Sequence, residues 1–180
     1  MKDQELSKIK TFQTKIFDWW NTNKREFPWR ETTDPYFVLL SEVMLQQTQA
    51  TRSIEKFKQF VESFPTIDSL AEAQKSEVLK QWSGLGYNRR ALWLQEAAKQ
   101  IIELGDFPKF PEALQALKGI GPYTGRAILI FAFNYDLSTV DTNIRRILIA
   151  EGFASETNTE KELYDIAFKI QPKGPFKRLV

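Results

Sequence analysis

The 180-residue chain contains no cysteine and no histidine. Without cysteine, disulfides, thiol nucleophiles and cysteine-ligated metal clusters are excluded within these residues. Without histidine, an imidazole base and the ordinary zinc sites are excluded as well. Any chemistry must therefore be performed by Asp, Glu, Lys, Tyr, Ser or Thr side chains.

The chain also lacks a strong charge bias and a long apolar run. Its 25 Lys and Arg residues nearly balance its 23 Asp and Glu residues, so a nucleic-acid surface would require local clusters of basic side chains. The longest apolar run, near 127–133, is too short to span a bilayer. The polar N-terminus lacks the apolar core of a signal peptide. These features predict a cytoplasmic protein without a membrane partner.

Helical periodicity extends along nearly the whole chain, and no alternating strand pattern of useful length is present. Apolar residues three and four apart predict an amphipathic helix that ends near 21–23. Asp34 and Pro35 predict the N-cap and the first position of a helix that runs to about Gln47. Further helices are predicted at 51–63, 67–73, 75–82, 88–104, 110–117, 123–134, 141–152 and 158–169. The sequence therefore predicts an all-α fold.

Two glycines one residue apart, Gly119 and Gly121, separate two predicted helices. We expect a turn too tight for a side chain at these positions. The first N–H groups of the following helix would then point outward, which suits a phosphate oxygen. The segment therefore predicts a phosphate-binding hairpin.

Two carboxylates have both a functional and a structural interpretation. Glu42 is flanked mainly by apolar residues on its predicted helix, which would raise its pKa and let it deliver a proton. The alternative is a surface glutamate on a hydrophilic stripe. Asp141, before another helix, fits an N-cap. An ionised Asp at a helix N-terminus could also stabilise a developing cation.

Two polar segments complete the set of candidates. Gln-Gln-Thr-Gln at 46–49 follows the end of an apolar helix, and Gly-Leu-Gly-Tyr-Asn-Arg-Arg at 84–90 combines a turn with an aromatic ring and two cations. Such groups can stack on bases and contact phosphates. A plain connector between helices is the alternative for the second segment.

In this order, the motifs resemble the helix-hairpin-helix DNA glycosylases, and among them the adenine DNA glycosylases of the MutY type. They are Phe-Pro-Trp-Arg at 27–30, Ser-Glu-Val-Met-Leu-Gln-Gln-Thr-Gln at 41–49, Gly-Leu-Gly-Tyr at 84–87, Gly-Ile-Gly-Pro-Tyr-Thr at 119–124 and Val-Asp-Thr-Asn at 140–143. The resemblance covers about residues 10–170. It implies an all-α, two-lobed fold, with a six-helix module at 29–137 and a second lobe formed by 1–28 and 138–180.

The resemblance implies catalytic roles for four residues. Glu42 corresponds to the general acid that protonates adenine at N7 and later helps to activate water. Asp141 corresponds to the carboxylate that stabilises the oxocarbenium ion or briefly bonds to it, with Tyr123 and Asn143 as its supports. The related endonuclease III type has a lysine at the position of Tyr123, so the resemblance implies a monofunctional enzyme without a Schiff base there.

The resemblance also implies how DNA is bound. Trp29, Arg30 and Leu45 would line the pocket for the flipped base, and Gln47 and Tyr87 would insert into the duplex. The predicted DNA-contacting residues are Gln47, Thr48, Tyr87, Arg89, Arg90, Gly119, Gly121 and Thr124.

The sequence departs from the family pattern in several places. The family's four-cysteine iron–sulfur cluster cannot form without cysteine, so we expect no cofactor and no metal. The domain that reads 8-oxoguanine and a late helix of the adenine pocket are also missing, which leaves selectivity open. The segment 171–180 ends on an apolar pair, as though another helix should follow, with a frayed terminus as the alternative.

The resemblance therefore implies a base-excision repair enzyme. We expect a monomer that binds double-stranded DNA and removes adenine mispaired with guanine or 8-oxoguanine, associated with the nucleoid if the source is prokaryotic. The alternatives are a thymine/uracil mismatch glycosylase and a DNA-binding protein without useful turnover.

Overall fold

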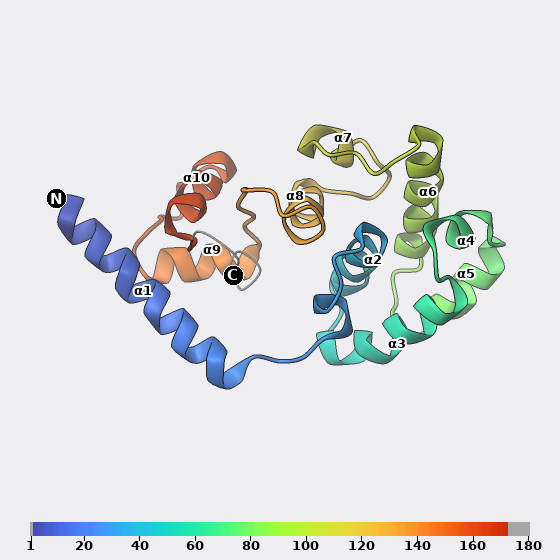
Figure 1. Ribbon diagram of the computed structural model, residues 1–180, viewed down its shortest axis with the longest axis horizontal. Helices are drawn as coiled ribbons and strands as arrows, with labels where there is room; N and C mark the ends of the chain where they lie inside the picture. The colour runs from blue at the N-terminus through green and yellow to red at the C-terminus, as the bar shows by residue number, and fades with distance from the viewer. Residues whose placement is uncertain (1, 173–180) are drawn as a thin grey trace. The chain divides into compact units, whose positions relative to one another are not determined.

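The computed structural model describes residues 2–172, and all regular secondary structure within them is helical (Figure 1). The elements are α1 (Lys2–Asn23), the 3-10 helix η1 (Pro28–Arg30), α2 (Pro35–Leu45), α3 (Ala50–Ser63), α4 (Ile67–Glu72), α5 (Lys75–Trp82), α6 (Arg89–Leu104), α7 (Pro111–Gln115), α8 (Pro122–Phe131), α9 (Thr142–Ala150) and α10 (Glu160–Ile170). The all-α prediction is confirmed for the described residues. Most of the C-terminal segment whose continuation was predicted, 173–180, lies outside them.

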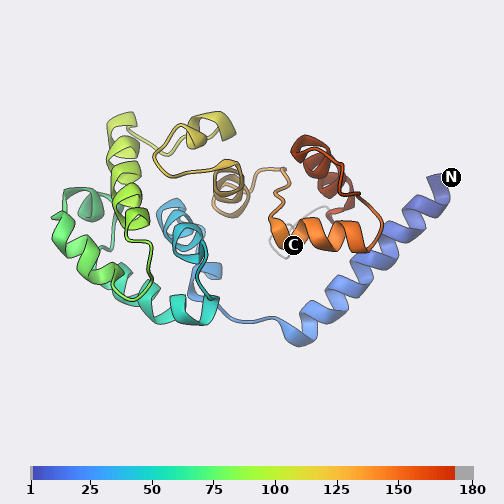
Figure 2. The ribbon, with the colours of Figure 1, turned by 180° about the vertical axis from the view of Figure 1, so that it is seen from behind.

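The chain divides into two compact units. One is Phe27–Tyr135, which contains η1 and α2 to α8; the other combines the residues up to Glu26 with those from Asp136 onward, and contains α1, α9 and α10 (Figure 2). The sequence-based boundaries at 29 and 137 each fall two residues later than those of the first unit. Each unit has a core of its own.

Helix α2 lies at the centre of the Phe27–Tyr135 unit because it is apolar on nearly every face. It packs against α3, α6 and α8. As predicted, Asp34 caps it by accepting a 2.8 Å hydrogen bond from the N–H of Tyr36, and Pro35 occupies its first position. The buried Tyr36 hydroxyl donates to the Phe64 carbonyl at 2.8 Å. The helix is therefore fixed at its N-terminal end, before it reaches Glu42.

The other unit is held together by contacts between both ends of the chain. Its buried cluster consists of Phe12 of α1, Leu148 of α9, and Leu163 and Ile170 of α10. The ring of Phe153 packs edge-on against Phe12, with 5.1 Å between the centroids. The apolar face of α1 therefore supports α9, the helix that begins after Asp141.

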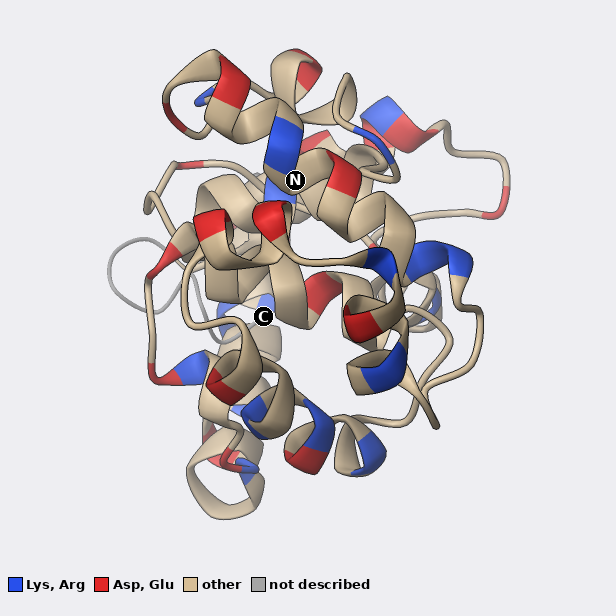
Figure 3. Cartoon of the chain, turned by 90° about the vertical axis from the view of Figure 1, so that its right-hand side faces the viewer, with Lys and Arg blue, Asp and Glu red and all other residues tan. Residues whose placement is uncertain are grey.

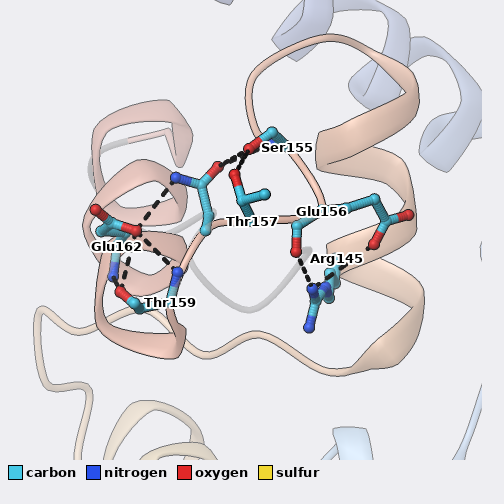
Figure 4. A network of polar contacts seen from close by, with 7 residues as sticks. Arg145, Ser155, Glu156, Thr157, Thr159 and Glu162 are labelled. Atoms are coloured by element: carbon cyan, nitrogen blue, oxygen red, sulfur yellow. Dashed lines mark hydrogen bonds and ion pairs between the residues drawn. The ribbon is translucent and has the colours of Figure 1, made fainter.

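A network of polar contacts fixes the connection between α9 and α10 (Figure 4). Arg145 donates from Nη2 to the Glu156 carbonyl at 2.9 Å. Thr159 and Glu162 form a capping box at the start of α10, in which the Thr159 N–H donates to Glu162 Oε2 at 2.8 Å. The hydrogen bonds that Glu162 accepts, first from the Thr159 N–H and then from the side chains of Asn158 and Thr159, lower the pKa of Glu162. The connection thereby holds α9 in place against α10.

Basic and acidic positions are interspersed along the helices (Figure 3). This distribution agrees with the near balance of charges in the sequence. No helix in residues 2–172 combines the length and the apolarity that a membrane span requires. Binding of an anionic polymer would therefore depend on a few local groups.

Candidate functional site

Glu42 lies in the C-terminal half of α2, partly buried between the buried residues Ser41 and Val43. Val38 and Leu39, one turn earlier on the same helix, are also buried. Glu42 is therefore less exposed than a residue on a solvated surface stripe. A carboxyl group in such a place is suited to holding or delivering a proton.

Asp141 is the N-cap of α9, as the structural interpretation of the sequence predicted. Its Oδ1 accepts a 2.7 Å hydrogen bond from the N–H of Ile144. Its Oδ2 accepts a 3.2 Å hydrogen bond from the side-chain amide of Asn143. The carboxylate is partly buried and lies at the positive end of the helix dipole, where a negative charge is stabilised. The predicted cap is therefore present, and two hydrogen bonds hold its carboxylate in place.

Tyr123 and Thr124 lie in the first turn of α8, in the Phe27–Tyr135 unit. Tyr123 is partly buried and Thr124 is 3% exposed. Thr124 therefore has little surface left for DNA and packs inside the unit. Asn143 contacts Asp141 directly, whereas Tyr123 belongs to the other unit.

The predicted hairpin is present, and α6 supports it. Gly119 has a φ of +79°, a conformation that favours glycine. A Cβ atom at Gly119 would lie 2.9 Å from the Cβ of Trp93. The N–H of Lys118 donates to the Gln100 side chain at 2.9 Å. The turn between α7 and α8 is therefore tight because the backbone at Gly119 lies directly on α6.

Gly121 differs from the expectation. Its φ is −89°, and a Cβ atom there would meet nothing within 4 Å. The turn itself therefore does not require glycine at this position. The two glycines differ because only Gly119 packs against α6, whereas Gly121 is the N-cap of α8 and has open space beside it. That open space lies beside the first turn of α8.

The three residues predicted to line a base pocket have different environments. Trp29 is 8% exposed and stacks on Phe27, with 5.0 Å between the ring centroids. Arg30 is exposed, and its guanidinium lies 4.9 Å from the centroid of Phe27. Leu45, the last residue of α2, is partly buried. Trp29 thus forms part of the aromatic core, while Arg30 and Leu45 keep accessible surface.

Gln47 and Tyr87 lie on two loops that border one open hollow of about 610 Å³. Both residues are exposed, and Tyr87 has 66% of its surface accessible. Both also have left-handed backbones, with φ of 55° and 48°. The hollow is lined by Gln47, Arg52, Leu79, Ser83, Gly84, Leu85, Gly86, Tyr87 and Asn88. The structure therefore brings together the two side chains that were predicted to insert into DNA.

Arg90 does not have the setting of a phosphate ligand. It is only 6% exposed, and its guanidinium donates to backbone carbonyls of the Phe27–Tyr135 unit. Burial lowers the pKa of Arg90 below its usual value. Arg89, by contrast, is exposed, with its guanidinium 5.6 Å from the ring centroid of Trp93. Of the predicted pair, Arg89 alone can reach a phosphate.

The sequence did not point to one residue that borders the hollow or to two residues that support the hairpin. Arg52 lies on α3 and reaches the same hollow as Tyr87. Trp93 and Gln100, both on α6, support the hairpin. The basic character of Arg52, five residues after Gln47, was a usable signal. No sequence signal links α6 to the hairpin, because that contact joins distant parts of the chain.

The described residues contain no group of three acidic, His or Cys side chains that could hold a metal ion. The cysteine-ligated cluster that the family implies does not fit these residues either, because iron–sulfur clusters need thiolate ligands and the 180 residues contain no cysteine.

Residues 40–173 match the family described as HhH-GPD superfamily base excision DNA repair protein. The adenine DNA glycosylase of Rattus norvegicus is 37% identical over 155 residues, which cover 80% of this chain and 30% of that protein. The thymine/uracil-DNA glycosylase of Methanothermobacter thermautotrophicus is 31% identical over 180 residues, which cover 97% of this chain and 81% of that protein.

Among solved structures, that of a thermostable thymine-DNA glycosylase superposes with a TM-score of 0.85 at 30% identity, covering 97% of this chain and 83% of that one. The chain spans about a third of the length of the mammalian adenine glycosylases that it matches. The matched residues include the C-terminal half of α2 with Glu42, the hairpin and the start of α9 with Asp141. The chain belongs to the HhH-GPD superfamily of base excision DNA repair proteins.

Proposed function

We propose that the chain is a monofunctional DNA glycosylase that removes adenine mispaired with guanine or 8-oxoguanine. The observation that carries this proposal is the position of Glu42, partly buried on an apolar helix. Adenine is a poor leaving group as an anion, and a proton at N7 makes it a good one. A partly desolvated carboxyl group can supply that proton.

In this mechanism the bond between C1′ of the sugar and N9 of adenine breaks, and water adds at C1′. Glu42 donates a proton to the departing base and then helps to deprotonate the water. Asp141 is held by the N–H of Ile144 and the amide of Asn143. Its carboxylate would stabilise the positive charge that develops at the sugar. Tyr123 stands where a Schiff-base enzyme has lysine, so water rather than an amine completes the reaction.

The DNA partner is supported by groups of the Phe27–Tyr135 unit. The N-terminus of α8 beside Gly121 is open to a phosphate. Arg89 is exposed, and Gln47 and Tyr87 border a common hollow. We propose double-stranded DNA with a mispaired base as the substrate and a monomer as the active form, in a DNA-associated cytoplasmic location.

Thymine or uracil excision is the second candidate. The thymine/uracil-DNA glycosylase matches nearly the whole of this chain and most of its own length. A pyrimidine can depart as an anion with less need of an acid. The two candidates therefore differ in how strongly they depend on Glu42.

The test is single-turnover base release from duplexes that carry adenine opposite guanine, adenine opposite 8-oxoguanine, thymine opposite guanine or uracil opposite guanine. We expect adenine release, and its near loss in Glu42→Gln with duplex binding retained. Glu62→Gln, an exposed position on α3, is the matched control and should react like wild type.

Release of thymine or uracil but not adenine would establish the second candidate instead. Binding of every duplex without release of any base would leave only the DNA-binding protein. An adenine rate in Glu42→Gln within a few-fold of wild type would refute the assigned acid.

A further inference from the structure

The buried guanidinium of Arg90 joins two loops that are far apart in the sequence. Its Nη1 donates to the carbonyls of Val43 at 2.8 Å and Met44 at 3.2 Å, and also to that of Gln46. Its Nη2 donates to the Thr48 hydroxyl at 3.1 Å and to two carbonyls of the second loop. Those two, of Leu85 and Gly86, are each 3.2 Å away.

The acceptors lie directly beside Gln47 and Tyr87. Gln46 precedes Gln47 and Thr48 follows it, while Gly86 precedes Tyr87. The backbone N–H of Arg90 also donates to the Tyr87 carbonyl at 2.9 Å. One side chain therefore fixes the backbone just before Gln47, the Thr48 side chain just after it, and the backbone on the near side of Tyr87.

Fixing is needed because Gln47 and Tyr87 have left-handed backbones. Such a conformation is unfavourable for residues other than glycine and persists only where the surroundings enforce it. Both residues are exposed, so most of the enforcement must come from Arg90, whose guanidinium also lies 5.6 Å from the centroid of the Tyr87 ring. The hydrogen bonds of Arg90 supply it from below the surface.

The charge of Arg90 is balanced by carbonyl dipoles. Val43 and Met44 belong to the last turn of α2, whose carbonyls lack partners within the helix and carry the negative end of its dipole. In the described part of the chain no carboxylate pairs with this guanidinium. Arg90 thus serves loop geometry rather than an ion pair.

We propose that Arg90 is a positioning residue that holds Gln47 and Tyr87 in the arrangement needed to extrude a base from DNA. This proposal rests on the proposed glycosylase function, because both side chains act only when a duplex is bound. Arg90 does not touch DNA. It acts through the two loops that border the common hollow.

Lysine is the informative replacement at position 90. It keeps the positive charge, but it has a single nitrogen with three N–H bonds in place of a planar fork. It therefore cannot hold both loops at once. A loop displaced by about 1 Å can reduce the rate of a positioned reaction by about 100-fold.

The experiment compares single-turnover release, at saturating protein, from two duplexes. One has adenine opposite 8-oxoguanine, and the other has adenine opposite an abasic analogue, where no base pair must be broken. We expect Arg90→Lys to slow release from the first duplex ~10- to 100-fold. Release from the second should fall by less than ~3-fold, because extrusion is easier for an unpaired base.

A second readout does not require base removal. In the Glu42→Gln background, 2-aminopurine placed at the target position should brighten when the protein extrudes it. We expect this increase to be lost in Glu42→Gln with Arg90→Lys and to be retained with Arg145→Lys. Arg145 is the matched control because it also donates to a loop carbonyl, that of Glu156, in the other unit.

Equal losses on both duplexes would make Arg90 a general structural residue and overturn the proposal. An unchanged 2-aminopurine signal in the Arg90→Lys protein, or no signal in its parent, would also overturn it. If no base is released but the signal depends on Arg90, the proposed enzymatic function fails and the positioning role stands.

Thr48→Val provides the test if Arg90→Lys does not fold. It removes a single acceptor of Arg90 and keeps the shape of the side chain. We expect a smaller loss with the same preference for the paired duplex. If Thr48→Val reduces the rate by the same factor on both duplexes, the proposal is again overturned.

Discussion

A turn can require glycine for two reasons, a positive φ or a neighbouring atom too close for a Cβ atom. Three glycines of the Phe27–Tyr135 unit allow these two reasons to be tested separately. Gly119 combines a φ of +79° with a Cβ position only 2.9 Å from the Cβ of Trp93. Gly105 has a φ of +83° but open space around its Cβ position. Gly121 has neither a positive φ nor a close neighbour. Replacing each by alanine adds the same single carbon in three different settings.

The expected destabilisation follows from these settings. For Gly105→Ala, the left-handed backbone costs about 1–2 kcal/mol, which the lower entropy of the unfolded chain offsets by about 0.4–1 kcal/mol. Gly119→Ala adds overpacking against a Cβ held by the α6 backbone, about 1–3 kcal/mol more. Gly121→Ala should change the stability by less than about 1 kcal/mol, because the lower entropy of the unfolded chain, about 0.4–1 kcal/mol, is offset by the weaker preference for alanine at an N-cap. We therefore expect Gly121→Ala to be the most stable of the three variants, Gly105→Ala to be intermediate and Gly119→Ala to be the least stable.

Thermal unfolding followed by circular dichroism measures this order, at roughly 2–4 °C per kcal/mol for a chain of this size. The affinity of each variant for duplex DNA is measured alongside its melting temperature. Gly121→Ala should weaken DNA binding while it folds normally, because its Cβ would occupy the space through which a phosphate approaches α8. Equal melting temperatures for Gly119→Ala and Gly105→Ala would refute the role of the Trp93 contact. A melting temperature for Gly121→Ala below that of Gly105→Ala would refute the reasoning as a whole.

Further predictions test other parts of the site. Arg89→Ala should weaken binding to all duplexes alike and reduce the log–log salt slope of DNA binding by about one unit, because one phosphate contact is lost; an unchanged slope would contradict this contact. Borohydride should trap no covalent complex with abasic DNA, because Tyr123 replaces the lysine of lyases; a strong band on a denaturing gel would reveal another amine. Tyr36→Phe should lower the free energy of unfolding in urea by about 1–3 kcal/mol, because the buried Phe64 carbonyl loses its donor; an unchanged value would show that water replaces the hydroxyl.

The helices were predictable because their signals are local. Asp34 and Pro35 mark the start of α2 by capping chemistry that involves adjacent residues alone. The predicted helices at 75–82 and 88–104 likewise match α5 and α6 to within a residue. Gly119 was predictable for the same reason, since a tight turn between two helices favours glycine locally.

What the sequence could not predict depends on distant contacts. Arg89 and Arg90 are adjacent and chemically identical, and helical spacing points them in different directions. Only the fold determines that Arg90 enters the space between the end of α2 and the 84–87 loop. Gly119 and Gly121 show the same effect as the two arginines: they are the same residue type one position apart, but α6 lies against Gly119 only. Identical residues therefore acquired different roles from their neighbours in space.

Asp141 has two roles, a helix cap and an anchored negative charge, and one substitution separates them. Asparagine caps helices as well as aspartate does, so Asp141→Asn should keep the free energy of unfolding within about 0.5 kcal/mol of wild type. If the carboxylate stabilises the developing cation, base release should still fall at least ~100-fold. Asp34→Asn is the matched control, because Asp34 caps α2 with the same kind of hydrogen bond and should lose neither stability nor rate. Equal single-turnover rates for the two variants would mean that the negative charge of Asp141 contributes only to the cap.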